Sequence, residues 1–242
     1  MPIPSSLKIH LINLYQMKTM KQAIIWLAYM GLLISMAGCN LAGLKLQENA
    51  DYHPYVLDPH INKTAWQYIK ERSYNFAGKD TVFKLMRQAI EYSGIDTNLY
   101  IKTDCTFIFL HNDAVYRLSN KVITADCYWG KYLVNGKPAT KWSDYPKDQV
   151  KNYLLYLIVQ GAYSFNNLTP VNVVATTLQP QNYDPLNPTS IMTLRVNNDQ
   201  NFTMRLNDFS NSVGYVSVRT SNILALNGAI QVIDRVLFYQ TK

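Results

Sequence analysis

The sequence predicts an α+β fold with one domain. Apolar residues at helical spacing are common before about residue 160, whereas short β-rich segments and polar turns dominate after Pro170. Helices early in the chain and strands later are typical of α+β domains. Removing a leader of 38 residues from the 242 leaves 242 − 38 = 204. That length is enough for one well-buried core and short for two.

Helices are expected mainly in the first half of the domain. A short helix is expected over Thr64–Glu71, and a longer one capped by Asp80 and ending near Gly94. A helical stretch is expected from Asn112 to Leu118. Another helix is expected over 149–159, with a core face made of Leu154, Leu155, Leu157 and Ile158.

Strands are expected where β-branched and aromatic residues cluster. Cys105–Leu110 is an apolar, β-rich run and predicts a buried strand, and Val122–Val134 predicts a strand that runs to a turn at Asn135–Gly136. Asn227–Gly228 predicts a second type I′ turn, with positive φ at both residues. The later strands, separated by polar turns and by a loop over 179–189, are expected at Val171–Leu178, Ile191–Val196, Phe202–Leu206, Val213–Thr220 and Ala229–Tyr239.

Residues 1–38 have the pattern of an export signal. Met17–Lys21 is basic, and Ala23–Ala37 is almost wholly apolar before the small residues Ala37 and Gly38. This apolar run of about 15 residues is shorter than the ~20 that a spanning helix needs. Residues 1–16 are interpreted as an upstream extension, because Met17 or Met20 would be a more natural start.

Met36-Ala37-Gly38-Cys39 resembles the lipobox of bacterial lipoproteins. The resemblance implies that the leader is cut before Cys39, whose thiol carries lipid; the alternative is an uncleaved anchor with an incidental cysteine. Two or three acyl chains would hold the protein stably on a membrane. Residues 39–63 would then be the lipidated cysteine and its tether. The protein is expected in the cell envelope, and the outer membrane, facing the periplasm or the cell exterior, is favoured. The sequence does not decide between the inner and the outer membrane, or between the two leaflets.

The net charge gives no reason to expect a nucleic-acid partner. The formal charge of the whole chain is +7, but Lys8, Lys18 and Lys21 lie in the leader, which has no acid. The remaining chain therefore has 20 basic and 16 acidic residues, or +4. These charges are scattered and form no basic stripe.

Two cysteines remain after the leader, Cys105 and Cys127. Outside the cytoplasm they could form a disulfide that closes a loop of about 20 residues and stabilises the fold by about 3 kcal/mol. Two separately buried thiols are the alternative, and the sequence leaves both open. A metal site is not expected, because there is no Cys-x-x-Cys motif and the four histidines do not cluster with the cysteines.

No catalytic residue, cofactor or metal is expected from the motifs. The chain has no Gly-x-Ser-x-Gly motif and no phosphate-binding loop, and its acids sit at turns and caps. His111 follows a predicted strand and could point into a cleft, but a satisfied or exposed histidine is expected rather than a base. The protein is therefore expected not to be an enzyme, with a hydrolase of dispersed site as a remote alternative.

Four segments in order resemble the fasciclin domain family. Ser221-Asn222-Ile223 and Asn227–Leu237 resemble its second signature, Asn-Gly-x-Ile-His-x-Ile-Asp-x-Val-Leu, with Gln231 in place of His. Leu154–Ser164 is similar to Leu-Leu-Tyr-His-Val-Val-x-Gly-x-Tyr, with Leu157 in place of His. Thr106–Phe109 with Asn112–Val115 resembles the first signature, interrupted by Leu110-His111, and the opening helix is represented by Phe83, Ile90 and Gly94.

The resemblance spans residues 64–240 and implies a wedge-shaped β-sandwich of short strands with helices from the N-terminal half. It also implies a non-enzymatic adhesion or binding module, similar to the lipid-anchored fasciclin-like proteins of Bacteroidota. An accessory lipoprotein of a surface polysaccharide or nutrient uptake system is the alternative. A glycan or protein ligand is expected in either case. The residues expected to be exposed and to contact it are Trp129, Tyr132, Trp142 and Tyr145, with Tyr156 from the family's Tyr-His pair.

Overall fold

The computed structural model describes residues 58–74, 80–199 and 201–242, together with two short helical pieces at 20–22 and 26–27. Asp58–Lys242 forms one compact unit, which contains the domain expected at 64–240. Cys39, most of the expected leader and the tether up to residue 57 lie outside the described residues. Among the residues that are described, no helix is long and apolar enough to cross a bilayer.

The first helices are fixed by caps that the sequence encodes. Helix α2 (Ala65–Glu71) begins after Thr64, whose hydroxyl and backbone N–H exchange hydrogen bonds with Gln67 as a capping box. Helix α3 (Lys84–Ser93) ends at Gly94, which has a φ of 65°. The predicted cap at Asp80 is wrong, because the helix begins only at Lys84 with Phe83 as its N-cap; the Asp80 carboxylate accepts a hydrogen bond from Arg72 Nε at 2.7 Å.

The central sheet has four strands in the order β4-β1-β10-β9. Strands β1 (Cys105–Leu110) and β10 (Gly228–Ile233) are parallel at its centre, and β4 (Ile158–Gln160) and β9 (Thr220–Ala225) flank them in antiparallel pairing. Every residue of β1 is buried, which confirms the predicted interior strand. The two central strands approach closely at Gly228, where an added Cβ would lie 1.9 Å from the carbonyl oxygen of Cys105.

The second sheet is antiparallel throughout. Its four strands are β5 (Val173–Thr176), β6 (Ile191–Val196), β7 (Met204–Leu206) and β8 (Val216–Ser217), in that order. A bridge between Val159 and Thr177 joins it to the central sheet. The predicted α+β class is confirmed, with short strands supplied mainly by the second half of the chain.

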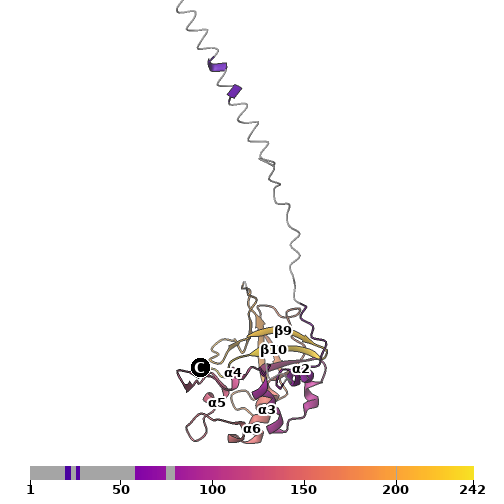
Figure 1. The fold of residues 1–242 in the computed structure, drawn as a ribbon, viewed down its shortest axis with the longest axis vertical. Coiled ribbons are helices and arrows are strands. Elements are labelled where there is room, and N and C mark those ends of the chain that lie inside the picture. The colour runs from indigo at the N-terminus through magenta and orange to yellow at the C-terminus, as the bar shows by residue number, and fades with distance from the viewer. Residues whose placement is uncertain (1–19, 23–25, 28–57, 75–79, 200) are drawn as a thin grey trace, which may run out of the picture. The chain divides into compact units, whose positions relative to one another are not determined.

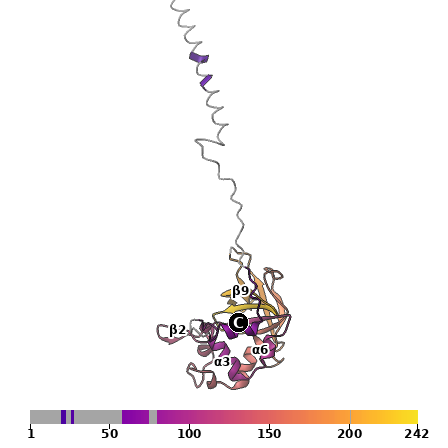
Figure 2. The same cartoon turned by 45° about the vertical axis from the view of Figure 1, so that its right-hand side comes forward.

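Helices α3 and α6 (Lys147–Tyr156) pack against each other and contribute to the core together with β1. In both views they lie on the side of the unit away from β9 (Figures 1 and 2). The remaining short elements are η2 (Thr97–Tyr100), α4 (Asn112–Val115), the hairpin β2 (Leu118–Ser119) with β3 (Val122–Ile123), α5 (Tyr128–Lys131) and η3 (Trp142–Asp144).

Three predicted elements are wrong in type over part of their length. The helix expected from Asn112 to Leu118 ends at Val115, and Leu118 lies in β2. The strand expected over Val122–Val134 ends at Ile123, and α5 follows because Tyr128 and Trp129 bury their rings from a helical turn. The helix expected to reach Val159 ends at Tyr156, since Ile158–Gln160 pairs with β1 instead. The turn at Asn135–Gly136 is confirmed, with φ of 50° and 74°.

The predicted type I′ turn at Asn227–Gly228 is wrong, because the φ of Asn227 is not positive. The Asn227 side chain instead links three segments by hydrogen bonds. Its side-chain Oδ1 accepts a hydrogen bond from Ala65 N at 2.9 Å. Its Nδ2 donates to the carbonyl oxygens of Tyr100 at 3.1 Å and Lys102 at 3.0 Å. One amide therefore joins the start of α2, the end of η2 and the hairpin of β9 and β10.

The free edge of β9 is covered by residues just before α2. Leu224 N donates to Pro59 O at 2.9 Å and Ile61 N donates to Leu224 O at 3.0 Å. A further bond joins Leu226 N to Lys63 O at 2.9 Å. The end of the segment expected to be a tether is therefore part of the fold, and it protects a strand edge that would otherwise be open to another chain.

Candidate functional site

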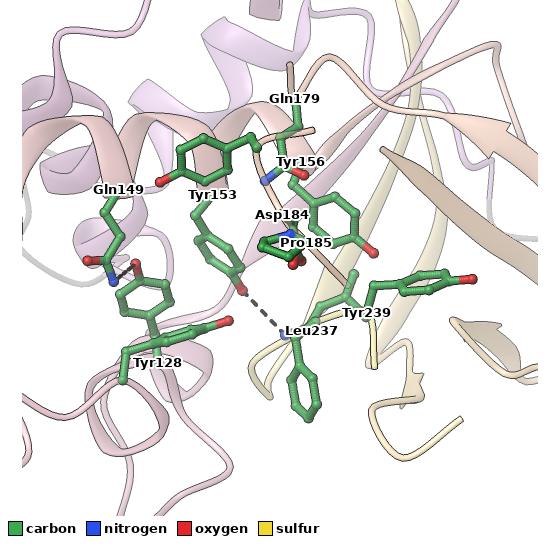
Figure 3. A pocket seen from close by; sticks show the side chains of 12 residues that line it. Tyr128, Gln149, Tyr153, Tyr156, Gln179, Asp184, Pro185, Leu237 and Tyr239 are labelled. Atoms are coloured by element: carbon green, nitrogen blue, oxygen red, sulfur yellow. Dashed lines mark hydrogen bonds between the residues drawn. The ribbon is translucent and has the colours of Figure 1, made fainter. Parts of the chain in front are cut away.

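A tyrosine-rich cavity of about 460 Å³ lies where α5, α6, the loop after β5 and the C-terminal segment meet (Figure 3). We call it the tyrosine cavity. Its lining residues are Tyr128, Tyr132, Gln149, Tyr153, Tyr156, Gln179, Tyr183, Asp184, Pro185, Leu237, Phe238 and Tyr239.

Helical spacing explains how α5 and α6 contribute their side chains. Gln149, Tyr153 and Tyr156 are four and three residues apart on α6, so they share one face of the helix. Tyr128 begins α5 and Tyr132 is its C-terminal cap, again four residues apart. Two helices thus present five polar-tipped side chains to the same space.

The loop from Gln179 to Ser190 is held by its own polar side chains. Asn182 has a φ of 61°, and its N–H donates to Pro188 O at 2.8 Å. The Asp184 carboxylate accepts from Leu186 N at 2.9 Å. Asn187 is buried and exchanges hydrogen bonds with Ile191, at 3.0 Å to its N and 2.7 Å to its O. These contacts place Tyr183 and Asp184 at the cavity.

Tyr128 is the centre of a cluster of aromatic rings behind the cavity. Its ring centroid lies 4.6 Å from those of Tyr132 and Tyr153, at interplanar angles of 49° and 48°. The rings of Trp142 and Tyr145 lie 5.1 Å and 5.2 Å away. Such tilted and edge-on pairs are favourable for aromatic rings. The wall of the cavity is therefore firmly packed.

The hydroxyl groups of three tyrosines accept hydrogen bonds from the protein. Leu237 N donates to Tyr153 at 3.3 Å, Asn207 Nδ2 to Tyr156 at 2.7 Å, and Gln149 Nε2 to Tyr128 at 3.4 Å. Within the described part of the chain, none of these three hydroxyls donates its own proton to a protein acceptor. Each phenol therefore keeps a proton that a ligand can accept.

Gln179, in contrast to these phenols, has an acceptor atom that lacks a donor among the described residues. The side chain is 9% exposed, and its Nε2 donates to Asn152 O at 3.4 Å. Its Oε1 is buried and accepts no hydrogen bond from any residue that the structure describes. A buried acceptor without a donor is unfavourable by about 1–3 kcal/mol, so this atom is suited to a ligand or water that brings a donor.

Burial keeps the phenols neutral. It raises the pKa of Tyr132 to about 12, with the Asp184 carboxylate acting in the same direction, and raises the pKa of Tyr128, Tyr153 and Tyr156 still further. Neutral phenols with such high pKa values are poor bases and poor nucleophiles near neutral pH. The arrangement is suited to holding a molecule by ring faces and hydrogen bonds.

Of the five aromatic residues that the sequence predicted for partner contact, only some line the tyrosine cavity. Tyr132 and Tyr156 line the tyrosine cavity, whereas Trp129, Trp142 and Tyr145 do not. The prediction that Trp129, Trp142 and Tyr145 are exposed is wrong, since Trp129 is 7% exposed and Trp142 and Tyr145 are each 4% exposed. Their large apolar rings pack into the core, and Trp142 also donates its indole N–H to Leu85 O at 2.8 Å.

Sequence reasoning missed Tyr128, Tyr153, Tyr183 and Tyr239 at the cavity. The high tyrosine content was a signal, with 18 in the chain. The spacing of Tyr153 and Tyr156 on a predicted helix was another. The loop and the C-terminal segment come to α6 only through tertiary folding, so local patterns could not join them.

A second group of polar residues surrounds His111. Its Nδ1 accepts from Asp113 N at 3.2 Å and caps α4, which confirms the expected satisfied histidine. Burial lowers its pKa, although Asp113 acts against this. A chain of ion pairs continues from there, joining Asp113–Arg219 (3.0 Å), Arg219–Asp234 (3.7 Å), Asp234–Arg117 (3.0 Å), Arg117–Asp126 (3.3 Å) and Asp126–Arg235 (3.0 Å).

The two residues that replace a signature histidine, Gln231 and Leu157, have structural roles. Gln231 is fully buried, and its Oε1 accepts from Asn222 N at 2.8 Å while its Nε2 donates to Tyr163 O at 3.0 Å. Leu157 is buried at the end of α6. Neither lies at the tyrosine cavity.

The two cysteines of the domain are separate buried thiols in the described residues, so the disulfide alternative is not realised. Cys105 lies beside Gly228 at the start of β10, and Cys127 follows Asp126, whose carbonyl accepts from Val236 N beyond its end. The two cysteines therefore lie near opposite ends of β10. The five residue steps from Gly228 to Ile233 span roughly 16 Å, which is too far for a disulfide between Cys105 and Cys127. Within the same part of the chain, no three His, Cys, Asp or Glu side chains group as a metal site requires.

Comparison with known proteins gives one family. The family model described as Fasciclin domain matches residues 81–239. Among solved structures, a domain pair from the insect cell adhesion molecule Fasciclin I aligns with a TM-score of 0.41 and 11% identity, covering 64% of this chain. The aligned part spans 44% of the length of that structure. None of the curated proteins matches this chain significantly.

Proposed function

Because this chain belongs to the fasciclin domain family, we propose that it is a lipid-anchored, non-enzymatic module for adhesion and binding outside the cytoplasm. The family match supports the adhesion role. The lipobox-like Met36–Cys39 supports export and anchoring. The observation that carries the binding role is the tyrosine cavity, whose functional groups are neutral phenols, amides and the carboxylate of Asp184.

The cavity supports binding rather than catalysis for an electrostatic reason. A general base needs a pKa near the working pH, and a nucleophile needs activation by a neighbouring base. The phenols have raised pKa values because of burial. Among the described residues that line the cavity, none is His, Lys, Arg or Cys.

Anchoring is tested with the full chain in its own envelope. The wild-type chain should take up labelled palmitate and sediment with membranes, whereas Cys39→Ser should lose the label and leave the membrane fraction. Cys127→Ser is a matched control, because a hydroxyl can replace the thiol contact to Thr124 O at 3.2 Å. A Cys39→Ser chain that stays labelled and membrane-bound would disprove lipidation at this residue.

Adhesion is tested on whole cells. Cells lacking the gene should attach less to the surface of neighbouring cells or to immobilised envelope polysaccharide, and the wild-type gene should restore attachment. A Cys39→Ser gene should not restore it, although the domain is unaltered. Equal attachment with and without the gene would argue against an adhesion role.

A further inference from the structure

We infer that the tyrosine cavity is a binding site for a neutral pyranose ring of a glycan. This inference rests on the proposed binding function and specifies the chemical class of its ligand. Three features of the cavity carry it: its ring faces, its mixture of hydrogen-bond donors and acceptors, and its charge.

The ring faces suit a sugar because a pyranose has an apolar C–H surface as well as hydroxyls. Tyr128, Tyr132, Tyr153, Tyr156, Tyr183, Phe238 and Tyr239 all line one space of about 460 Å³. This volume is within the ~300–1,000 Å³ usual for small-molecule sites. The C–H groups on one face of a pyranose chair carry partial positive charge, so they pack well on aromatic faces, which carry partial negative charge.

The polar groups call for a ligand that both donates and accepts hydrogen bonds. The hydroxyls of Tyr153 and Tyr156 already accept from the protein, so they are set to donate. Buried Gln179 Oε1 has the opposite need and requires a donor. A sugar hydroxyl is donor and acceptor at once, and several hydroxyls around one ring can meet these groups together.

The charge of the lining selects among ring-shaped ligands. Asp184 is the one formally charged side chain among the described lining residues. It would repel a uronic acid or a phosphorylated sugar. Choline, a small quaternary cation, would suit the aromatic faces and Asp184, but its single hydroxyl cannot donate to Gln179 Oε1 and also accept from the hydroxyls of Tyr153 and Tyr156 together. The neutral sugar satisfies all three requirements.

The test measures binding of defined sugars by the full chain, in a detergent without a sugar headgroup. Saturation-transfer NMR and calorimetric titration would use the methyl glycosides of glucose, galactose, mannose and N-acetylglucosamine, with glucuronate and choline for comparison. We expect at least one neutral glycoside to bind. Glucuronate should bind at least tenfold more weakly, and choline should give no signal.

Variants locate the binding. Tyr183→Ala should weaken the neutral sugar by about 3–10-fold, from the loss of one aromatic contact. Tyr74→Ala is the matched control, because Tyr74 and Tyr183 are both 43% exposed and Tyr74 does not line the cavity. Asp184→Asn should leave neutral sugars within threefold and strengthen glucuronate. Unchanged sugar binding in Tyr183→Ala would overturn the inference.

Two other outcomes would also overturn it, and both are separable from failure of the proposed function. If none of the neutral sugars binds at millimolar concentration, or if choline binds and Asp184→Asn abolishes that binding, the ligand is not a neutral sugar. If Tyr183→Ala still lowers cell attachment in that case, the proposed binding function is retained and only the sugar as ligand is rejected. Loss of the gene without any effect on attachment would instead remove the adhesion role itself.

Discussion

Replacing Asn227 by Ala should destabilise the domain more than its position in a short hairpin suggests. The side chain makes three hydrogen bonds, one to Ala65 N and two to the carbonyls of Tyr100 and Lys102. At about 1 kcal/mol each, their loss is expected to lower the free energy of unfolding by about 3 kcal/mol. Ala65 is fully buried, so its N–H would be left without a partner.

Urea denaturation and thermal unfolding of the full chain, followed by circular dichroism, measure this loss. For a domain of this size, about 3 kcal/mol corresponds to a decrease in Tm of roughly 6–12 °C. Asn227→Asp keeps the acceptor but places a carboxylate against two carbonyl oxygens. It should therefore be at least as unstable as Asn227→Ala at pH 7.

Asn166→Ala is the control for the chemical change itself. Asn166 is exposed, and its substitution should change the free energy of unfolding by less than about 0.5 kcal/mol. A loss below about 1 kcal/mol in Asn227→Ala would refute the reasoning, because it would mean that the three contacts do not hold the segments together.

Three further outcomes are expected. Gly228→Ala should prevent folding or reduce the free energy of unfolding by more than about 4 kcal/mol, since its Cβ would meet Cys105 O at 1.9 Å; a folded variant of near wild-type Tm would contradict this. Burial lowers the pKa of His111 in the folded state. The contribution of this residue to stability is therefore complete above the unfolded pKa of about 6.5 and is lost as the pH falls through that value toward the folded pKa. The urea midpoints at pH 7.5 and pH 5.0 should differ less in His111→Asn, which keeps a capping side chain, than in the wild type. Dithiothreitol should leave the Tm unchanged, because Cys105 and Cys127 are separate thiols, and a decrease would indicate a disulfide.

The sequence predicted the elements that short-range patterns define. The short helix over Thr64–Glu71, the helix end at Gly94 and the buried strand over Cys105–Leu110 each depend on patterns within a few turns or one strand, and all three are confirmed. The fold class followed from the order of such segments, and the family from its signatures.

The errors arose where tertiary contacts override local pattern. Tyr128 and Trp129 have β propensity, but burial of both rings in one cluster favours a helical turn. The same burial made Trp142 and Tyr145 core residues instead of contact residues. The tyrosine cavity joins α5, α6, a loop and the C-terminal segment, and nothing in the local sequence says that these four meet.

The bonding of Pro59–Lys63 to β9 has a mechanical consequence if lipid holds the chain at Cys39. A pull on a ligand in the cavity would be resisted at the anchor, so tension would enter the domain through this segment. The bonds to Leu224 and Leu226 would carry that load before the central strands do. These bonds would break first, while the parallel pair of β1 and β10 and the tyrosine cavity stay intact.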